Sequence, residues 1–234
     1  MSYPEQLYTS ARYLELNPSW DREDAPWKAA RVMDILRLAG SEPVSICEVG
    51  CGSGDVLAQL RLHFPDSRMS GFDISPYAKA FWHAHETSNI SFHVGDFLSG
   101  DDCFDTILLL DVLEHLADPH GFLSAIRARA TQFVIHFPLD LSVSSVLRES
   151  PLLNVRRKVG HIHYFTRGLA LELLDECGFE VVHSQFTGAA FNAPRSSWKT
   201  RIAQIPRRIA YALNQELGVR LLGGETLIVL AKPK

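Results

Sequence analysis

Three glycines at alternate positions join an apolar, strand-like run to a helix-like run near the start of the chain. The strand-like run is Val44–Val49, the glycines are Gly50, Gly52 and Gly54, and the helical pattern begins at Asp55. Glycine permits backbone angles that other residues rarely adopt, and it lets main-chain atoms approach a ligand closely. Such a turn therefore predicts an α/β fold with a ligand site where the strand ends.

Further apolar runs of strand length alternate with helical patterns along the chain. The predicted strands are Val44–Val49, Arg68–Asp73, Ile90–Val94, Phe104–Leu110, Gln132–Phe137, Phe179–Gln185 and Thr226–Ala231. The predicted helices between them cover residues 55–62, 76–85, 119–130 and 166–177. This alternation predicts βαβ units and a mostly parallel sheet with helices on both faces.

The residues around the glycines narrow the choice of ligand. A phosphate-binding P-loop needs a Lys-Ser/Thr pair after its glycines, and Asp55 and Val56 stand there instead. The dinucleotide fingerprint G-x-G-x-x-G is one residue longer than the spacing found here. Glu48 and Asp55 place two acids beside the turn, which suits a positively charged ligand better than one carrying two phosphates.

Acidic residues also follow the next three predicted strands. Asp73 ends the second strand, Asp96 and Phe97 follow the third, and Asp111 and Val112 follow the fourth. Because ligands of open α/β sheets bind outside the carboxyl ends of the strands, we expect these residues to surround the glycine turn. Asp73 is placed to bind both hydroxyls of a ribose, and Asp96 with Phe97 to bind the amine and the face of a purine.

Taken together, these motifs make the stretch from about Val44 to Val182 resemble the class I S-adenosylmethionine-dependent methyltransferases. The segment Asp111–Pro119, with the sequence DVLEHLADP, is similar to that of the small-molecule branch that carries this motif after the fourth strand. The resemblance implies a Rossmann-like, seven-stranded, mostly parallel sheet with helices on both faces and an antiparallel last strand.

The resemblance also implies the cofactor, S-adenosyl-L-methionine, and the residues that bind it. The glycines would pass under its methionine portion, Glu48 would orient the loop and the amino group, and Asp111 would form the floor near the sulfonium. The cofactor-binding residues that it implies are Glu48, Gly50, Gly52, Gly54, Asp73, Ile74, Asp96, Phe97, Asp111 and Val112.

Histidines are the candidates for a catalytic base, because their unperturbed pKa lies nearest neutrality. His115 lies one helical turn after Asp111, and His161 and His163 precede a predicted helix in a stretch that borders the acceptor pocket in the family. We treat these three histidines as a candidate base or as acceptor-pocket residues, and a purely bracing role for His115 stays open. His161 and His163 have no evident third ligand and only Asp140 nearby, so we expect no metal.

The function that these observations favour is methyl transfer to a small-molecule acceptor, with oxygen preferred over nitrogen or carbon. The alternatives are a nicotinamide-dependent oxidoreductase and a non-catalytic cofactor-binding module of the same fold. A nucleic-acid substrate is disfavoured, because the net charge is −4 and no Asn-Pro-Pro-Tyr-like signature of flipped-base chemistry occurs.

We divide the chain into an N-terminal helical lid or cap (1–40), a cofactor-binding core (41–185), a helical insertion (186–225) and the final strand (226–234). The tyrosines and tryptophans of the first segment either cover the cofactor or bury that segment against the sheet. A polar N-terminus and the lack of any apolar run of 18 residues favour a cytoplasmic protein without integral membrane contact. A homodimer is left open.

The insertion carries an amphipathic pattern. Six basic residues occur between residues 195 and 220, namely Arg195, Lys199, Arg201, Arg207, Arg208 and Arg220. Helical spacing relates Ile202, Ile205, Ile209, Leu213 and Leu217, with Pro206 expected to split the segment into two helices. We interpret the basic face as solvated and the apolar face as packed on the domain, with an acidic acceptor, a membrane surface or a second subunit as alternatives.

Overall fold

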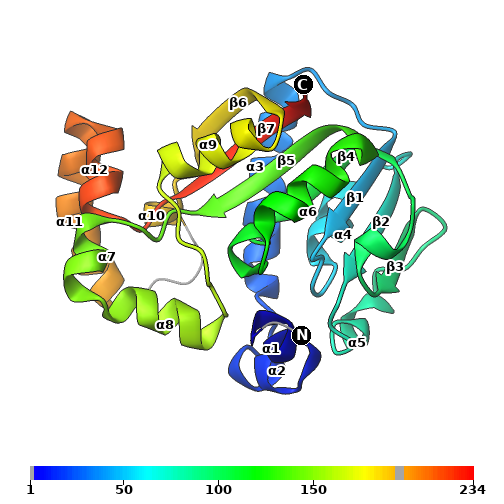
Figure 1. Ribbon diagram of the computed structural model, residues 1–234, viewed down its shortest axis with the longest axis horizontal. Coiled ribbons are helices and arrows are strands. Elements are labelled where there is room, and N and C mark those ends of the chain that lie inside the picture. The colour runs from blue at the N-terminus through cyan, green and yellow to red at the C-terminus, as the bar shows by residue number, and fades with distance from the viewer. Residues whose placement is uncertain (1–2, 193–197) are drawn as a thin grey trace.

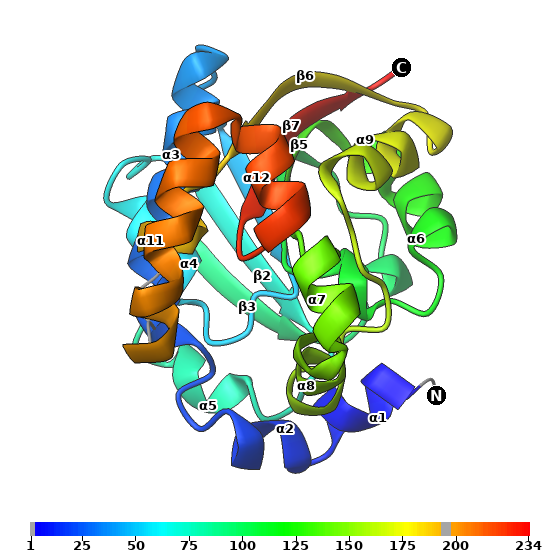
Figure 2. The same ribbon diagram turned by 90° about the vertical axis from the view of Figure 1, so that its left-hand side faces the viewer.

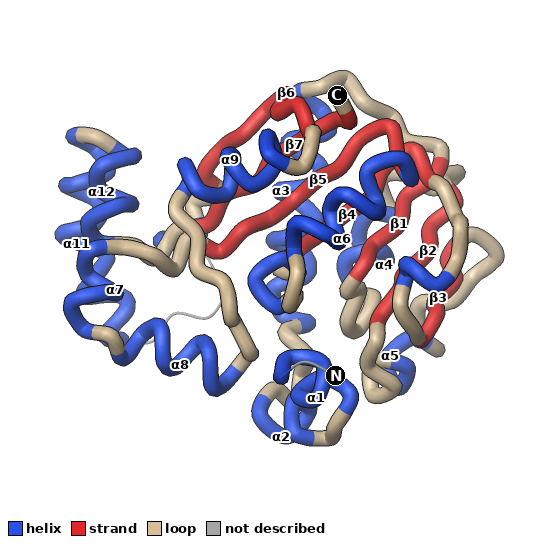
Figure 3. The backbone as a smooth tube through the Cα atoms, viewed as in Figure 1, coloured by secondary structure: helices blue, strands red, loops and turns tan. Residues whose placement is uncertain are grey.

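The computed structural model describes the backbone of residues 3–192 and 198–234 and the side chains of residues 6–192, 204 and 206–234. The strands are β1 (Ser45–Val49), β2 (Arg68–Asp73), β3 (Ile90–Val94), β4 (Phe104–Leu110), β5 (Ala130–Pro138), β6 (Phe179–Phe186) and β7 (Thr226–Pro233). Within the described residues these strands form one sheet in the order β3-β2-β1-β4-β5-β7-β6 (Figures 1 and 3). β1 to β5 are parallel, and β7 is antiparallel to both of its neighbours, which confirms the predicted Rossmann-like fold.

The central strand β4 shows why the sheet needs helices on both faces. Leu108 and Leu110 belong to one buried cluster, and Ile107 and Leu109 belong to another, because successive side chains of a strand point to opposite faces. The helices α3 (Ala25–Leu38) and α4 (Asp55–Arg61) supply the first cluster, and α6 (Pro119–Ile126) and α9 (Arg167–Glu176) supply the second. Figure 1 shows α6 and α9 in front of the sheet and α3 and α4 behind it.

Side-chain caps fix where the two front helices begin. The carboxylate of Asp118 accepts a hydrogen bond from the Gly121 N–H (2.8 Å), and Pro119 occupies the first helical turn of α6. The hydroxyl of Thr166 accepts from the Leu169 N–H (3.3 Å) at the start of α9. Each cap satisfies an N–H group that has no partner within its helix, so both starts were recognisable in the sequence.

The predicted strands match the observed ones to within two residues at each end, whereas the helices differ more. The expected helix over 76–85 contains only α5 (Lys79–Trp82), and the one over 119–130 consists of α6 followed by η4 (Arg127–Arg129). Short elements that were not predicted are α1 (Tyr3–Thr9), α2 (Arg12–Leu16), η1 (Arg22–Asp24), η2 (Phe97–Ser99), η3 (Leu113–His115), α7 (Val143–Arg148), α8 (Ser150–Lys158) and α10 (Ala189–Asn192).

The predicted break at Pro206 is wrong. Helix α11 (Trp198–Leu213) continues through Pro206. The helical conformation is interrupted at Asn214, before α12 (Gln215–Leu222). The Asn214 backbone is extended, and its side chain accepts from the Leu217 N–H (2.9 Å), so this residue ends one helix and starts the next.

The apolar face of this segment is also not packed on the domain as expected. Ile209, Leu213 and Leu217 are 61%, 83% and 52% exposed. Five further positions named for this segment lie outside the described backbone or side chains, namely Arg195, Lys199, Arg201, Ile202 and Ile205.

Helices α11 and α12 lie between β6 and β7 in the chain and pack beside α7, to the left of the sheet in Figure 1 and toward the viewer in Figure 2. None of the described helices combines the length and apolar character that a bilayer crossing requires.

Two glycines with a left-handed backbone give a matched test of packing at the glycine turn. A Cβ on Gly54 (φ 80°) would lie 2.5 Å from the ring of Phe92, whereas one on Gly40 (φ 61°) would meet none of the described atoms within 4 Å. We expect Gly40→Ala to lower the free energy of unfolding by about 1–2 kcal/mol through backbone strain alone. Gly54→Ala should cost a further 1–3 kcal/mol or so, because the ring must move. Equal losses in urea unfolding would contradict the described packing.

Candidate active site

The glycine turn is held by the carboxylate that ends β2. Gly50, Gly52 and Gly54 all have left-handed φ angles, of 74°, 52° and 80°. One oxygen of Asp73 accepts from the Gly52 N–H (2.8 Å), and the other accepts from the Ser75 N–H (2.8 Å). Asp73 therefore ties the turn after β1 to the loop after β2, and the two N–H groups stabilise its negative charge.

A cavity of about 960 Å³ opens at this edge of the sheet, where β1, β2 and β4 end. The strand order reverses between β1 and β4, which is the usual place for a ligand in an open α/β sheet. The predicted residues that line it are Glu48, Gly50, Gly52, Asp73, Ile74, Asp96, Phe97, Asp111, Val112, His115 and His161. The cavity therefore runs from the glycine turn to two of the three candidate histidines.

Two predicted residues are turned to other tasks. Gly54 is not part of the lining and serves as the N-cap residue of α4. His163 donates from Nε2 to the carbonyl of Leu116 (2.9 Å), which joins its loop to the chain after η3. Asp55, one of the two acids used to argue for a positively charged ligand, pairs with Arg22 (2.7 Å) instead of lining the cavity.

The N-terminal segment covers the cavity and is itself buried. Tyr8, Tyr13 and Trp20 line the cavity, and Tyr13 and Trp20 are only 7% and 8% exposed. The Ser75 hydroxyl donates to the Tyr8 carbonyl (2.6 Å), so this segment is anchored to the loop after β2. Figure 1 shows α1 and α2 below the ends of the strands. Covering and burial, posed as alternatives from the sequence, thus occur together.

Glu48 is a buried acid whose charge is not paired in the described structure. Its side chain is 3% exposed, and Oε2 has no hydrogen-bond partner among the described residues. Burial raises the pKa of Glu48 to about 8, although Lys28 acts in the opposite direction. The carboxyl is therefore mostly protonated at neutral pH, and a cation placed beside it would favour its ionised form.

Asp111 lies at the centre of a chain of polar contacts across the cavity. Its oxygens contact Lys28 Nζ (2.7 Å) and His136 Nδ1 (2.6 Å), and His136 Nε2 contacts the Thr226 hydroxyl (2.8 Å). Burial alone would raise the pKa of Asp111, but His136 and Lys28 outweigh it and hold this pKa well below its usual range. Asp111 is therefore ionised at neutral pH, and its φ of 58° stores backbone strain at the same point.

Away from the glycine turn, His115 and His161 line the cavity, and Glu114 is buried beside them. Glu114 is fully buried, and neither carboxylate oxygen has a hydrogen-bond partner among the described residues. Burial raises the pKa of Glu114 well above its usual range, and the nearby Asp111 adds to this. Burial likewise lowers the pKa of His115 to about 3, with His161 as a second cause, so His115 is neutral and a weak base at pH 7.

Several residues of the site were missed from the sequence. Glu114 stands within the DVLEH motif but was assigned no role, and His136 lies two residues before the end of β5, where a ligand-facing residue is expected. These two positions were therefore within reach of the strand-end argument. The contact of the Tyr8 hydroxyl with His115 Nδ1 (3.2 Å) was also missed, although Tyr8 belongs to the segment 1–40 that was expected to be helical.

Comparison with known proteins finds a matching family and a curated relative. Residues 22–184 match the family model described as "Methyltransferase domain". A curated relative, trans-aconitate 2-methyltransferase from Deinococcus radiodurans, is 28% identical over 103 residues. The matched part is 44% of this chain and 40% of the relative, so it spans less than half of the relative's length.

Two solved structures share the fold. The N-methyltransferase NodS from Bradyrhizobium japonicum WM9, in complex with S-adenosyl-L-homocysteine, has a TM-score of 0.61 and 16% identity over 99% of each chain. The mitomycin 7-O-methyltransferase MmcR has a TM-score of 0.64 and 18% identity over 100% of this chain and 61% of that one. At such identities the likeness establishes the fold and leaves the acceptor undetermined.

The ion pair between Lys28 and Asp111 makes a prediction about stability. In Asp111→Asn, the isosteric side chain still tolerates a left-handed backbone, but a partly buried lysine loses its counter-ion. We expect the free energy of unfolding to fall by about 2–4 kcal/mol. Asp175→Asn, which breaks the exposed pair with Lys234, should change it by less than about 1 kcal/mol. Similar effects of the two substitutions would show that the Asp111 contacts contribute little.

The raised pKa of Glu48 makes a prediction about pH. A carboxyl group whose pKa is higher in the folded state lowers stability as pH rises from its ordinary value, about 4.3, to about 8. Glu48→Gln should therefore match the wild type near pH 5 and become more stable than it by about 1–3 kcal/mol near pH 8. Urea unfolding across this range measures the difference, with the exposed Glu172→Gln as a control. A difference that does not change with pH would contradict the burial of an unpaired acid.

Proposed function

This chain belongs to the methyltransferase domain family of S-adenosylmethionine-dependent enzymes, and we propose that it methylates an oxygen atom of a small molecule. The observation that carries the proposal is the continuous cavity, which is lined by the glycine turn and also by His115 and His161, with the buried Glu114 beside the two histidines. Its volume, about 960 Å³, lies within the upper part of the range of small-molecule sites.

The residues at the first end fit the cofactor. A Cβ on Gly50 would lie 2.8 Å from Val112, and one on Gly52 would lie 2.8 Å from Trp20. Neither position therefore has room for a side chain. Asp73 has free lone pairs beyond its two N–H contacts, which suits the hydroxyls of a ribose. The unpaired Oε2 of Glu48 suits the positively charged methionine portion.

S-adenosylmethionine supplies a methyl group on a sulfonium, which is already an electrophile. The protein therefore has to align an acceptor and exclude water, and alignment alone is worth on the order of 7–11 kcal/mol. The N-terminal aromatic residues close the cavity from one side, and the contacts of Asp111 with Lys28 and His136 fix a rigid polar wall. Both features hold reactants in place and require no movement of charge during the reaction.

The acceptor end supports oxygen as the methylated atom. His115 is neutral and weakly basic, so His161 is the better candidate for a base: Asp140 accepts from its Nδ1 (2.6 Å), which leaves the Nε2 lone pair available. A base near the acceptor helps a hydroxyl group most, because a hydroxyl becomes a strong nucleophile only when it loses its proton. A neutral amine is already nucleophilic and needs such a base less. As their names state, MmcR methylates oxygen, whereas NodS methylates nitrogen.

The two alternatives from the sequence fare differently. Because the chain belongs to the methyltransferase family, we discard the hypothesis of a nicotinamide-dependent oxidoreductase. A non-catalytic module would be favoured by an acceptor pocket filled with protein side chains, but the cavity extends to His115 and His161. We therefore retain a catalytic function.

Calorimetric titration with S-adenosylhomocysteine tests the cofactor site. We expect micromolar binding to the wild type, and Asp96→Ala should weaken it by about 10-fold or more through loss of one charge-assisted hydrogen bond. Asp96 is exposed and its substitution should leave the fold intact, which urea unfolding verifies. NAD serves as the negative control, and unchanged binding to Asp96→Ala or tight binding of NAD would contradict the proposed site.

The acceptor is then sought with a panel of small hydroxy acids, phenols and amines, each incubated with S-adenosylmethionine. Mass spectrometry and NMR of the products locate the methyl group. Methylation of the amines alone would overturn the assignment to oxygen, and His161→Ala should slow the reaction by about 100-fold or more if it is the base.

A further inference from the structure

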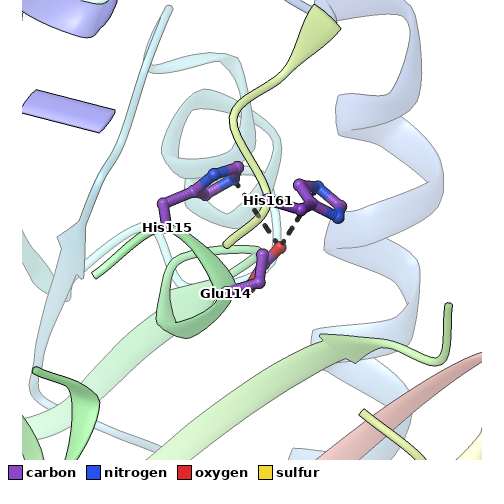
Figure 4. Close-up of side chains that lie close together, drawn as sticks. All are labelled: Glu114, His115 and His161. Carbon is purple, nitrogen blue, oxygen red and sulfur yellow. Dashed lines mark ion pairs between the residues drawn. The ribbon is translucent and has the colours of Figure 1, made fainter. Parts of the chain in front are cut away.

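Glu114, His115 and His161 bring three ligating atoms together at the acceptor end of the cavity. The atoms all lie within 4.8 Å of one another, and Glu114 Oε1 is 3.7 Å from His115 Nε2 and 3.9 Å from His161 Nε2. Figure 4 shows the two imidazoles approaching the Glu114 carboxylate from different segments, η3 and the loop after α8. Both histidines line the cavity, so the cluster is open on that side.

The carboxylate of Glu114 is the feature that needs an explanation. Its side chain is fully buried, and the structure as described gives neither oxygen a hydrogen-bond partner. A buried acid without partners costs free energy, and most buried polar groups are satisfied for that reason. Its oxygen instead faces the ring nitrogens of two histidines at distances too long for hydrogen bonds.

The surroundings hold the histidines in the form that binds a metal. Asp140 accepts from Nδ1 of His161 (2.6 Å), which leaves the lone pair on Nε2, the atom that faces Glu114. A carboxylate behind a ligating histidine is the usual outer contact of metal sites, because it fixes the ring and its tautomer. The Tyr8 hydroxyl donates to the Val159 carbonyl (2.7 Å), so toward His115, whose Nδ1 and Nε2 lie 3.2 and 3.3 Å away, it acts only as an acceptor. One of the two ring nitrogens donates to it, and the other keeps its lone pair.

We propose that Glu114, His115 and His161 bind a divalent transition-metal ion at the acceptor end of the cavity. Two imidazoles and one carboxylate favour zinc, manganese, iron or cobalt over magnesium or calcium. Ligands about 2.1 Å from a common ion lie about 3.0–3.4 Å apart, so side-chain movements of about 1 Å complete the site. From the sequence we expect no metal, because only His161 and His163 stand out there as possible ligands. In the structure His163 donates to the Leu116 carbonyl, and the second histidine beside His161 is His115.

The charges around the cluster also match a divalent cation. Glu114 and Asp140 are two acids beside two histidines, and Lys28 of the cavity wall is already paired with Asp111. A dication favours loss of the proton from Glu114, and its binding would satisfy a carboxyl group that the described residues leave without a partner. Burial strengthens this attraction, because the effective dielectric is lower than in water.

Three protein ligands leave coordination positions that open toward the cavity. With the ion bound, the Nε2 lone pair of His161 is a ligand, so the ion takes over from His161 the task of favouring deprotonation of an acceptor hydroxyl. An acceptor with oxygen donors, such as a hydroxy acid or a catechol-like phenol, would complete the coordination and be oriented by it. This part of the inference rests on the proposed function, whereas metal binding itself does not.

The test is metal binding to the full-length protein after treatment with a chelator, in the absence of cofactor and acceptor. We expect one equivalent of zinc to bind in calorimetric titration and cobalt to give visible absorption bands, with magnesium binding far more weakly. Glu114→Gln should abolish both signals, and Asp140→Asn should weaken zinc binding by about 10–100-fold. His120→Ala should leave binding unchanged, because His120 and Glu176 form an exposed His–Glu pair (3.1 Å) away from the cavity.

A second measurement separates a metal ligand from a structural acid. Glu114→Gln keeps the shape of the side chain, and its backbone carbonyl still accepts from the Ile162 N–H (2.9 Å), so we expect a folded variant. Zinc should raise the melting temperature of the wild type and of His120→Ala but not that of Glu114→Gln. The proposal is overturned if the stripped wild type binds neither zinc nor cobalt, or if Glu114→Gln binds them as the wild type does.

The two proposals fail separately. Zinc binding without any methyl transfer from S-adenosylmethionine would contradict the proposed function and leave the metal site standing. Cofactor binding and methyl transfer by a protein that binds no transition metal would overturn the metal site and leave the proposed function standing.

Discussion

Negative charge at the carboxyl edge of the sheet is the constraint on which the rest of the site depends. Parallel strands end at one edge, and in this chain several of them end in or next to an acid. Asp73 is met by two backbone N–H groups, and Asp111 by a lysine and a histidine. Glu48 and Glu114 are buried with at least one oxygen unpartnered among the described residues. The paired acids shape the cavity, and the other two are where we propose that cationic groups bind.

This distribution of charge also orders the cavity along its length. The glycine turn and Glu48 form the end that fits the cofactor, and Glu114 with its two histidines forms the end proposed for the acceptor. Asp111 contacts both Lys28 and His136, so its carboxylate cannot move toward either ligand without losing one of these contacts. In the arrangement that we propose, two positively charged partners, a sulfonium and a metal ion, are separated by a wall whose own charge is already compensated.

Much of the fold was predictable because its determinants are local. The strands from Arg68–Asp73 to Phe104–Leu110 were located from runs of apolar residues, and the glycine turn from its spacing. The break at Asn214 was not, because proline and asparagine both disfavour helix continuation and only the packed structure shows which one prevails. The exposure of the apolar face of α11 and α12 was missed for a similar reason. An amphipathic pattern shows that one face of a helix is apolar, but it does not show which surface that face contacts.

The sequence by itself determined the Rossmann-like sheet, the glycine turn and the acids at the strand ends. The periodicity of apolar side chains, the spacing of the glycines and the position of an acid directly after a strand are all properties of short stretches of chain. Only the tertiary structure decided which charges are compensated. His161 turned toward Glu114 and His163 away from it, although the two are separated by one residue, because alternate contacts with Asp140 and Leu116 select opposite directions. Pairing of buried groups depends on distances of a few ångströms between distant segments, and such distances are set by packing of the whole domain.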